Sequence, residues 1–342
     1  MKPQEYKWNE KLWKPIVRPP RHCYHLKDLG NDLFKIKDTI TKRTDFEIYN
    51  NRNQKLQCSL FEPINMQGNP HPCMIYLHGN SSSRIEAFTI IEYLIPANIS
   101  VCGIDLSGIQ NKVDKVLDYL KGNIYLWDFM SVTMLYAYMI TQEKTNYITS
   151  IGLWGRSMGS VTAILAAYNN IDFKVLVCDS PFSNLTLLCK ELAKENYKIP
   201  NCCFNCFWCY VKSKIHQEVQ FNIDELNIVQ KIQVLPQDVH ILFLSAQQDD
   251  LIRESHPKLL MKQFRGQDKE LFSFEGTHNS KRPAKIMEDS VAFVLKAFGQ
   301  NVWTASNIKY AMKYSQNQLS KQVPLLKGDK RSVQPHMEKD DY

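Results

Sequence analysis

The sequence predicts an α/β fold with a mostly parallel central sheet flanked by helices. Short apolar runs alternate with helical patterns between residues 73 and 274, and such alternation is typical of parallel strands joined by crossover helices. With 342 residues, 44% of them hydrophobic, the chain is long enough to bury one large core. The predicted strands are Cys73–Leu77, Ser100–Asp105, Ile148–Trp154, Phe173–Asp179, Val239–Ser245 and Glu270–Phe274.

The residues before these strands have a different composition. Residues 1–43 carry several prolines among mixed charges, which indicates an extended arm. The segments Asp45–Asn50 and Gln54–Glu62 alternate apolar and polar residues on either side of a turn-like stretch. We expect them to form an antiparallel hairpin that starts the sheet. The predicted domain therefore covers residues 44–298.

Two further segments lack the pattern of a strand. No strand is apparent between residues 181 and 235, although the strands on either side are expected to be neighbours in the sheet. An inserted helical lid is the economical interpretation. Residues 299–342 lose their periodicity and are rich in polar and charged side chains. We expect this tail to be disordered.

Charge and hydropathy exclude some classes of protein. The net charge of +7 is spread along the chain without basic stripes, so no nucleic-acid partner is expected. The N-terminus lacks the apolar core of a secretion signal, which predicts a cytoplasmic protein whose cysteines are mostly thiols. The longest apolar stretch, residues 124–140, contains Asp128 and is shorter than the roughly 20 residues of a membrane span. It is predicted to be a buried core helix.

The pentapeptide Gly155-Arg156-Ser157-Met158-Gly159 lies between an apolar strand and a helical stretch. In a nucleophile elbow the chain reverses so sharply that the central serine takes strained backbone angles, and side chains two residues before and after it would collide. This explains glycine at both flanking positions. The turn would expose the Ser157 hydroxyl at a helix N-terminus, so Ser157 is the predicted nucleophile.

A second glycine turn follows the strand that ends at Leu77. Its sequence, His78-Gly79-Asn80, predicts a backbone N–H aimed at a reacting carbonyl oxygen. The amides of Asn80 and Met158 together would form an oxyanion hole. The His78 side chain is predicted to be structural. His78 precedes Ser157 in the chain, whereas the general base that works with a nucleophile elbow follows the serine.

The acid and the base are expected in loops after later strands. The loop after Ser245 contains Asp249 and Asp250, either of which could orient a histidine, and Asp179 after the preceding strand is a third candidate. Asp249 is favoured. The loop after Phe274 contains His278, which is the predicted base.

Five blocks of sequence resemble those of serine aminopeptidase-like and prolyl-oligopeptidase-like α/β-hydrolases, a group that includes depalmitoylase-type enzymes. The blocks are HGNSSSR, GLWGRSMGS, DSPFSNL, QQDDLI and FEGTHNSKRP. The resemblance implies an α/β-hydrolase fold and supports Asp249 over Asp250, because Asp249 aligns with the acid of the family pattern. It also implies hydrolysis through an acyl-enzyme on a Ser-His-Asp triad, with no cofactor or metal.

Several functions are compatible with this resemblance. The main hypothesis is a serine hydrolase that cleaves an ester, thioester or amide of a small-molecule, acyl or peptide substrate. Ester and thioester bonds are favoured, because the sequence shows no propeller domain or acidic pocket that would point to peptide termini. The alternatives are a peptidase of the serine aminopeptidase type, a palmitoyl-protein thioesterase-like enzyme, and a non-catalytic binding module with a hydrolase fold.

The predicted lid contains four cysteines and four aromatic residues between positions 202 and 210. The favoured interpretation of Cys202, Cys203, Cys206 and Cys209 is an apolar helix packed over the site. A metal cluster is less favoured, because the fourth cysteine of a ferredoxin-like run is missing. The third interpretation is S-acylation or peripheral contact with a membrane.

Overall fold

The computed structural model describes residues 24–50, 53–106, 147–169, 172–219 and 222–299, together with the helical residues 132, 133, 135, 136 and 139. Most of the predicted arm and the whole of the predicted tail after residue 299 lie outside these residues. So does most of the core helix expected over residues 124–140. The five described residues of that segment are helical, and three of them, Val132, Leu135 and Met139, are fully buried.

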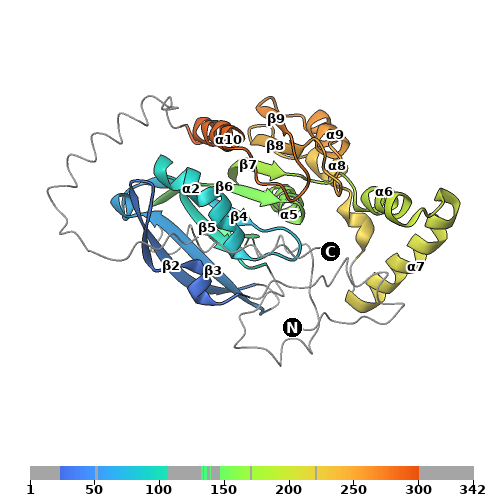
Figure 1. Ribbon diagram of the computed structural model, residues 1–342, viewed down its shortest axis with the longest axis horizontal. Coiled ribbons are helices and arrows are strands. Elements are labelled where there is room, and N and C mark those ends of the chain that lie inside the picture. Colours follow the sequence, from blue (N-terminus) through green and yellow to red (C-terminus); the bar gives the residue numbers. More distant parts are fainter. Residues whose placement is uncertain are drawn as a thin grey trace. The chain divides into compact units, whose positions relative to one another are not determined.

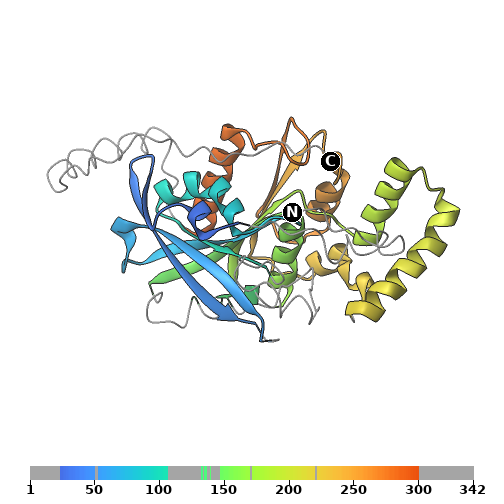
Figure 2. The same ribbon diagram turned by 60° about the horizontal axis from the view of Figure 1, so that its bottom comes forward.

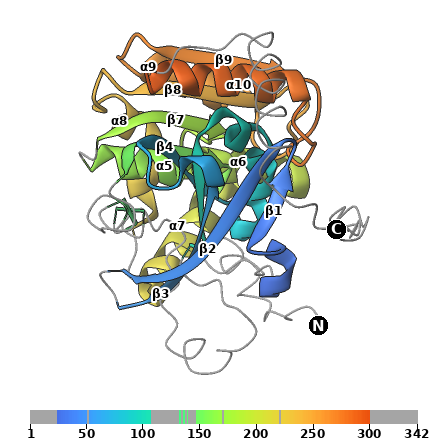
Figure 3. The same ribbon diagram turned by 90° about the vertical axis from the view of Figure 1, so that its left-hand side faces the viewer.

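The described strands form one nine-stranded sheet in the order β1-β2-β3-β5-β4-β6-β7-β8-β9. From β5 to β9 all neighbouring strands are parallel, and the three N-terminal strands are antiparallel to their neighbours. Figure 3 shows this succession, with β9 at the top and β2 and β3 below. The strands are β1 (Leu33–Ile36), β2 (Thr39–Tyr49), β3 (Lys55–Pro63), β4 (His71–Leu77), β5 (Ser100–Ile104), β6 (Ile148–Arg156), β7 (Phe173–Asp179), β8 (His240–Ala246) and β9 (Lys269–Phe274).

All six strands predicted from apolar runs are present, and the predicted hairpin is β2 and β3. The prediction that the sheet starts at Asp45 was wrong, because β1 and the first part of β2 lie in the predicted arm. β1 is an edge strand with no buried residue, and β2 buries the polar Thr41 and Arg43. Arg43 is compensated by ion pairs with Asp32 and Asp45. The first strands of the sheet therefore lack the alternation of apolar and polar residues from which a strand is predicted.

Helices cover both faces of the sheet, as Figures 1 and 2 show. On one face, α2 (Phe88–Leu94) and α10 (Ala284–Ala297) pack with the short 3-10 helix η3 (Arg84–Ala87). On the other face, α5 (Met158–Tyr168), α8 (Ile228–Ile232) and α9 (Ser255–Gln263) form the second and larger part of the core. The carboxyl ends of the parallel strands thus lie along one edge of the sheet, between the two layers of helices.

The segment between β7 and β8 is helical, as predicted. It contains α6 (Leu185–Tyr197), α7 (Asn201–Val219) and the 3-10 helix η6 (Ile223–Leu226) before α8. Its two ends meet at a β-bridge between Asn184 and Asn227, and the Ser183 carbonyl accepts hydrogen bonds from the amides of Ile228 and Val229. The pair α6 and α7 extends to one side of the sheet in Figures 1 and 2.

Polar side chains fasten α6 to the start of α9. His256 is buried, its Nε2 donates to Glu191 at 2.9 Å, and its Nδ1 lies 2.8 Å from the Ser183 hydroxyl. One turn further along α6, Glu195 forms an ion pair with Arg253. The inserted helices are therefore held to the loop that follows β8. Among the described residues, no helix has both the length and the apolar character needed to cross a bilayer.

The favoured interpretation of the cysteine-rich segment was wrong in one respect. It forms the first part of α7, but the side chains that pack against the core are Phe204, Trp208, Val211 and Ile215. The four cysteines of this helix are exposed. The aromatic residues interleaved with them supply the buried face, since positions four or three apart share one side of a helix. Within the described part of the chain, no three His, Cys, Asp or Glu side chains are arranged to hold a metal ion.

Candidate active site

Ser157 occupies a sharp turn between β6 and α5. Its backbone has φ 52° and ψ −115°, angles that cost a residue with a side chain roughly 1–3 kcal/mol and that persist only where the surroundings enforce them. Its N–H donates to the Asp179 carbonyl at 2.7 Å, which holds the turn against the end of β7. The serine is partly exposed, whereas Met158 and the residues of α5 up to Ala167 are buried.

The two glycines of the pentapeptide are required by close backbone contacts. A Cβ on Gly155 would lie 2.2 Å from the Gly159 carbonyl oxygen, and a Cβ on Gly159 would lie 2.0 Å from the Leu77 carbonyl oxygen. Both distances are far shorter than any real carbon–oxygen contact. Side chains at these two positions would therefore collide, as expected from the sequence, and the second distance shows that the start of α5 lies directly against the end of β4.

Gly159→Ala is expected to lower the free energy of unfolding by about 3 kcal/mol or more, because the added methyl can be accommodated only by shifting α5 from β4. A fall in Tm of roughly 10 °C would report this loss. Gly79→Ala is the matched control, since its Cβ would meet nothing closer than 3.7 Å. Equal Tm values for the two variants would contradict the steric argument.

The loop after β4 is organised by the fully buried His78. Its Nδ1 donates to the Gly79 carbonyl at 2.7 Å, and its Nε2 accepts from the Leu106 amide at 3.1 Å, so the ring has the structural role predicted for it. The Ser82 amide donates to the Gly79 carbonyl and closes a turn. That hydrogen bond does not use the N–H of Asn80, the second residue of the turn.

Met158 supplies the other predicted donor. It is the first residue of α5, and the intrahelical bonds to the Ser157 carbonyl come from Ser160 and Val161. The Met158 N–H thus belongs to the first turn, where amides have no intrahelical acceptor and the helix dipole favours negative charge. Because β4 and β6 are parallel neighbours with Leu77 opposite Gly155, both predicted donors belong to the same edge of the sheet.

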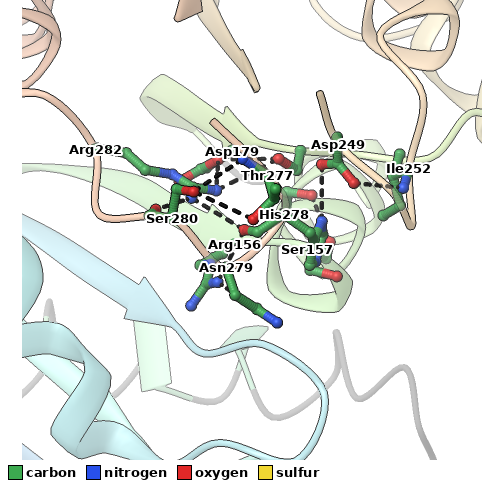
Figure 4. A network of polar contacts seen from close by, with 12 residues as sticks. Arg156, Ser157, Asp179, Asp249, Ile252, Thr277, His278, Asn279, Ser280 and Arg282 are labelled. Atoms are coloured by element: carbon green, nitrogen blue, oxygen red, sulfur yellow. Dashed lines mark hydrogen bonds and ion pairs between the residues drawn. The ribbon is translucent and has the colours of Figure 1, made fainter. Parts of the chain in front are cut away.

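His278 and Asp249 lie together at this edge. His278 Nδ1 is 2.8 Å from Asp249 Oδ2, and both side chains are buried. The second oxygen, Oδ1, accepts from the amides of Leu251 and Ile252 at 2.9 and 2.7 Å. Burial alone would raise the pKa of Asp249, but the hydrogen bond and charge of His278 together with the two amides lower it. The carboxylate is thus an acceptor that fixes the Nδ1–H tautomer. Figure 4 shows His278 between Asp249 and Ser157.

The other two candidate acids are placed differently. Asp250 is exposed, whereas His278 and Asp249 are buried. Asp179 is buried and receives two hydrogen bonds from Arg282, at 2.7 and 2.8 Å. Arg282 also donates to the His278 carbonyl at 3.0 Å. Asp179 thus fixes Arg282, which in turn positions the backbone of the His278 loop. Asp249 is the carboxylate that contacts the imidazole ring.

A network that the sequence did not predict connects three loops of the site, and Figure 4 shows its part around Arg156, His278 and Asn279. Arg156 forms an ion pair with Glu86 and donates to the His278 carbonyl at 3.1 Å and to Asn279 Oδ1 at 2.9 Å. The other oxygen of Glu86 accepts from the Gly79 amide at 2.7 Å. The network thereby links the loop after β4, the Ser157 turn and the His278 loop. No local pattern signals it, because its contacts join residues up to 123 positions apart.

Several solved structures have a similar fold. The esterase Pf2001 of Pyrococcus furiosus is 19% identical, with a TM-score of 0.57 over 81% of this chain and 98% of that one. This match and the nine-stranded, mostly parallel sheet with helices on both faces indicate the same fold. The chain has the α/β-hydrolase fold.

Two other esterases share this α/β-hydrolase fold. Acetyl xylan esterase 1 of a Thermoanaerobacterium species is 16% identical, with a TM-score of 0.56 over 78% of this chain and 86% of that one. Est1E of Butyrivibrio proteoclasticus, solved with ferulic acid bound, is 17% identical, with a TM-score of 0.52 over 75% and 100%. No protein-family model and no curated protein sequence matches the chain.

Proposed function

We propose that the protein is a serine hydrolase that cleaves carboxylic esters through an acyl-enzyme on Ser157. The observation that carries this proposal is the strained, partly exposed Ser157 at the same edge of the sheet as the buried pair of His278 and Asp249. A hydroxyl becomes a nucleophile when an adjacent base removes its proton, and a base acts well when a third group fixes its tautomer. The chain supplies one residue for each role.

In the proposed first step, Ser157 Oγ attacks the carbonyl carbon and His278 Nε2 takes the hydroxyl proton. The Nδ1–H of His278 remains hydrogen-bonded to Asp249, whose carboxylate stabilises the imidazolium that forms. The same proton then passes to the leaving alkoxide. In the second step His278 takes a proton from water as the water oxygen attacks the acyl carbon, and His278 returns that proton to Ser157 Oγ when the acid is released.

The developing negative charge on the carbonyl oxygen would be stabilised by the amides of Met158 and Asn80. Met158 begins α5, so its N–H and the helix dipole act in the same direction. Asn80 belongs to the turn closed by Ser82, which leaves its N–H outside the turn's own hydrogen bond. One such donor contributes roughly 3 kcal/mol to the stabilisation of a tetrahedral intermediate.

Among the possible bonds, we favour esters because three of the solved structures that resemble this chain are named as esterases. Thioesters react by the same steps. The inserted helices α6 and α7 arise at the end of β7, the edge at which Ser157 lies, and we propose that they form the lid of the site. Their attachment through Glu191 and Glu195 to the loop after β8 supports that position.

Labelling with a fluorophosphonate probe tests the proposal. The purified full-length protein is expected to react with one equivalent, and peptide mapping is expected to find the adduct on Ser157. Hydrolysis of p-nitrophenyl esters of graded acyl length would then show which acyl groups the site accepts. A well-folded protein that neither reacts with the probe nor hydrolyses any ester would instead be a non-catalytic module.

Arg156 is a positioning residue in this proposal, and Arg156→Lys is expected to lower kcat by about 10- to 100-fold. A lysine keeps the charge but cannot reach Glu86, the His278 carbonyl and Asn279 with one planar fork. The His278 loop would then shift relative to Ser157. Steady-state kinetics should show the change mainly in kcat, with KM altered little.

The exposed Arg265 offers a matched control, because Arg265→Lys makes the same chemical change away from the site. Its kcat should equal that of the wild type. Thermal unfolding of both variants separates positioning from stability. If Arg156→Lys loses activity only in proportion to the fraction unfolded, or loses none, the positioning role is refuted.

A further inference from the structure

Four exposed thiols lie on the first part of α7, within eight residues of one another. They are Cys202, Cys203, Cys206 and Cys209. The other cysteines that the structure describes are placed differently. Cys58, Cys73, Cys102 and Cys178 are buried in the sheet, and Cys189 is partly buried, with burial raising its pKa to about 12. Accessible thiols are therefore concentrated on this one helix.

Packing of the opposite face fixes the direction of these thiols. Phe204 and Trp208 stack at 5.6 Å between ring centroids, and the Trp208 Nε1–H donates to Thr186 of α6 at 3.1 Å. Val211 and Ile215 continue the buried stripe. Rotation of α7 would break this contact with α6, so the cysteines stay on the outer side. In Figure 1 that helix lies at the edge of the molecule, beyond α6.

The geometry of a single helix disfavours a shared metal ion. Cys202 and Cys209 are separated by about 10 Å along the axis, at 1.5 Å per residue. Ligand sulfurs of one zinc ion lie roughly 4 Å apart, because each Zn–S bond is about 2.3 Å. The four thiols therefore cannot converge on one tetrahedral ion.

Disulfides are disfavoured by the same geometry. Residues three or four apart on a helix have Cβ atoms about 5–6 Å apart, whereas a disulfide needs about 3.5–4.5 Å. The Sγ atoms of the adjacent Cys202 and Cys203 are 3.8 Å apart. The hydrogen bond and charge of Cys202 also raise the pKa of Cys203, whereas redox-sensing thiols have a low pKa.

The surroundings of the thiols suit an anionic lipid surface. Tyr210, beside Cys209, is exposed, and aromatic rings with a polar tip are favoured at the membrane interface. Lys194 and Lys198 line, together with Glu195, a surface depression at the junction of α6 and α7. Lys212 and Lys214 follow the cysteines on α7, Lys212 in an ion pair with Asp224. Lysines near acylated residues add electrostatic attraction to anionic headgroups.

We propose that the α7 thiols are S-acylation sites, which hold this helix against an anionic membrane surface. The acyl donor is a long-chain acyl-CoA: the cysteine sulfur attacks its thioester carbonyl, a new C–S bond forms, the C–S bond to CoA breaks, and the thiol proton ends on the released CoA. One acyl chain binds a membrane only marginally, whereas two or more anchor a protein stably, so a cluster of four sites fits this use.

Metabolic labelling with an alkyne analogue of palmitate in cultured eukaryotic cells tests this proposal. The full-length chain is expected to carry a label that hydroxylamine removes and to sediment with membranes. The variant with Cys202→Ser, Cys203→Ser, Cys206→Ser and Cys209→Ser should lose the label and remain in the supernatant, with an unchanged Tm. Cys189→Ser is the matched control and should keep both properties.

The same measurement in a Ser157→Ala background keeps any thioesterase activity of the protein from removing the label. Labelling there does not require the proposed hydrolase activity, so the two proposals can fail separately. A wild type and a Ser157→Ala protein without label would overturn the acylation proposal. So would a label that persists in the fourfold variant, or intact-mass spectra that show the four thiols joined in disulfides or bound to metal.

Discussion

Ser157→Ala is expected to abolish reaction with the fluorophosphonate probe and to lower kcat for ester hydrolysis by about a millionfold. The loss is this large because the alanine methyl cannot form the acyl-enzyme, and the remaining groups can only polarise the carbonyl and position water. The fold should be unaffected or slightly stabilised, since a strained backbone at φ 52° carries a smaller side chain. Gel fluorescence, ester kinetics and Tm are the measurements.

The chain provides a stringent control for this experiment. Ser183, His256 and Glu191 form a second serine, histidine and carboxylate set, with distances of 2.8 and 2.9 Å. Ser183 is fully buried, and both its amide and its hydroxyl face the same histidine nitrogen. This set is structural, because no substrate carbonyl can reach the hydroxyl.

Ser183→Ala should therefore keep the probe reaction and the kcat of the wild type. It should lose about 1 kcal/mol of stability, the usual contribution of one hydrogen bond. If the Ser157→Ala protein keeps the labelling and the Ser183→Ala protein loses it, the nucleophile is Ser183. That outcome would refute the proposed function.

Elements were predictable from the sequence where one local constraint dominates. Strands β4, β5, β7 and β8 are almost entirely buried and read as uninterrupted apolar runs, whereas the edge strand β9 buries only Phe274. The bounds of all six predicted strands agree with the structure to within two residues. Gly155 and Gly159 were predictable because no other residue fits 2.0–2.2 Å from a carbonyl oxygen. The loop positions of Asp249 and His278 followed from the order of elements, and the structure brings these two together.

Features that depend on distant partners were not predictable. β1 is an exposed edge strand, and the first part of β2 buries Arg43, which pairs with Asp32, so neither carries an apolar alternation. Arg156 and Glu86 meet only in the folded chain, 70 positions apart. For α7, helical spacing correctly grouped the cysteines, but the direction they face is set by the packing of Trp208 against α6.

Asp249→Asn is expected to lower kcat by about ten-thousandfold while leaving the loop in place. An asparagine oxygen can still accept from the amides of Leu251 and Ile252, so the local turn survives. The side-chain amide would, however, face His278 Nδ1 with a donor, which favours the tautomer with its proton on Nε2. That tautomer cannot take the Ser157 proton. Ester kinetics and probe labelling rates measure the effect.

Asp250→Asn makes the same change one residue later, at an exposed position, and should leave kcat unchanged. Acid unfolding gives a second readout. Because the pKa of Asp249 is lowered in the folded protein, its carboxylate stabilises the fold above the ordinary carboxyl range, and this contribution is lost as the pH falls. The Asp249→Asn protein should lose stability less steeply in acid. Full activity in Asp249→Asn would show that Asp249 only stabilises the turn. Loss of activity in Asp250→Asn would show that Asp250 is the acid of the triad.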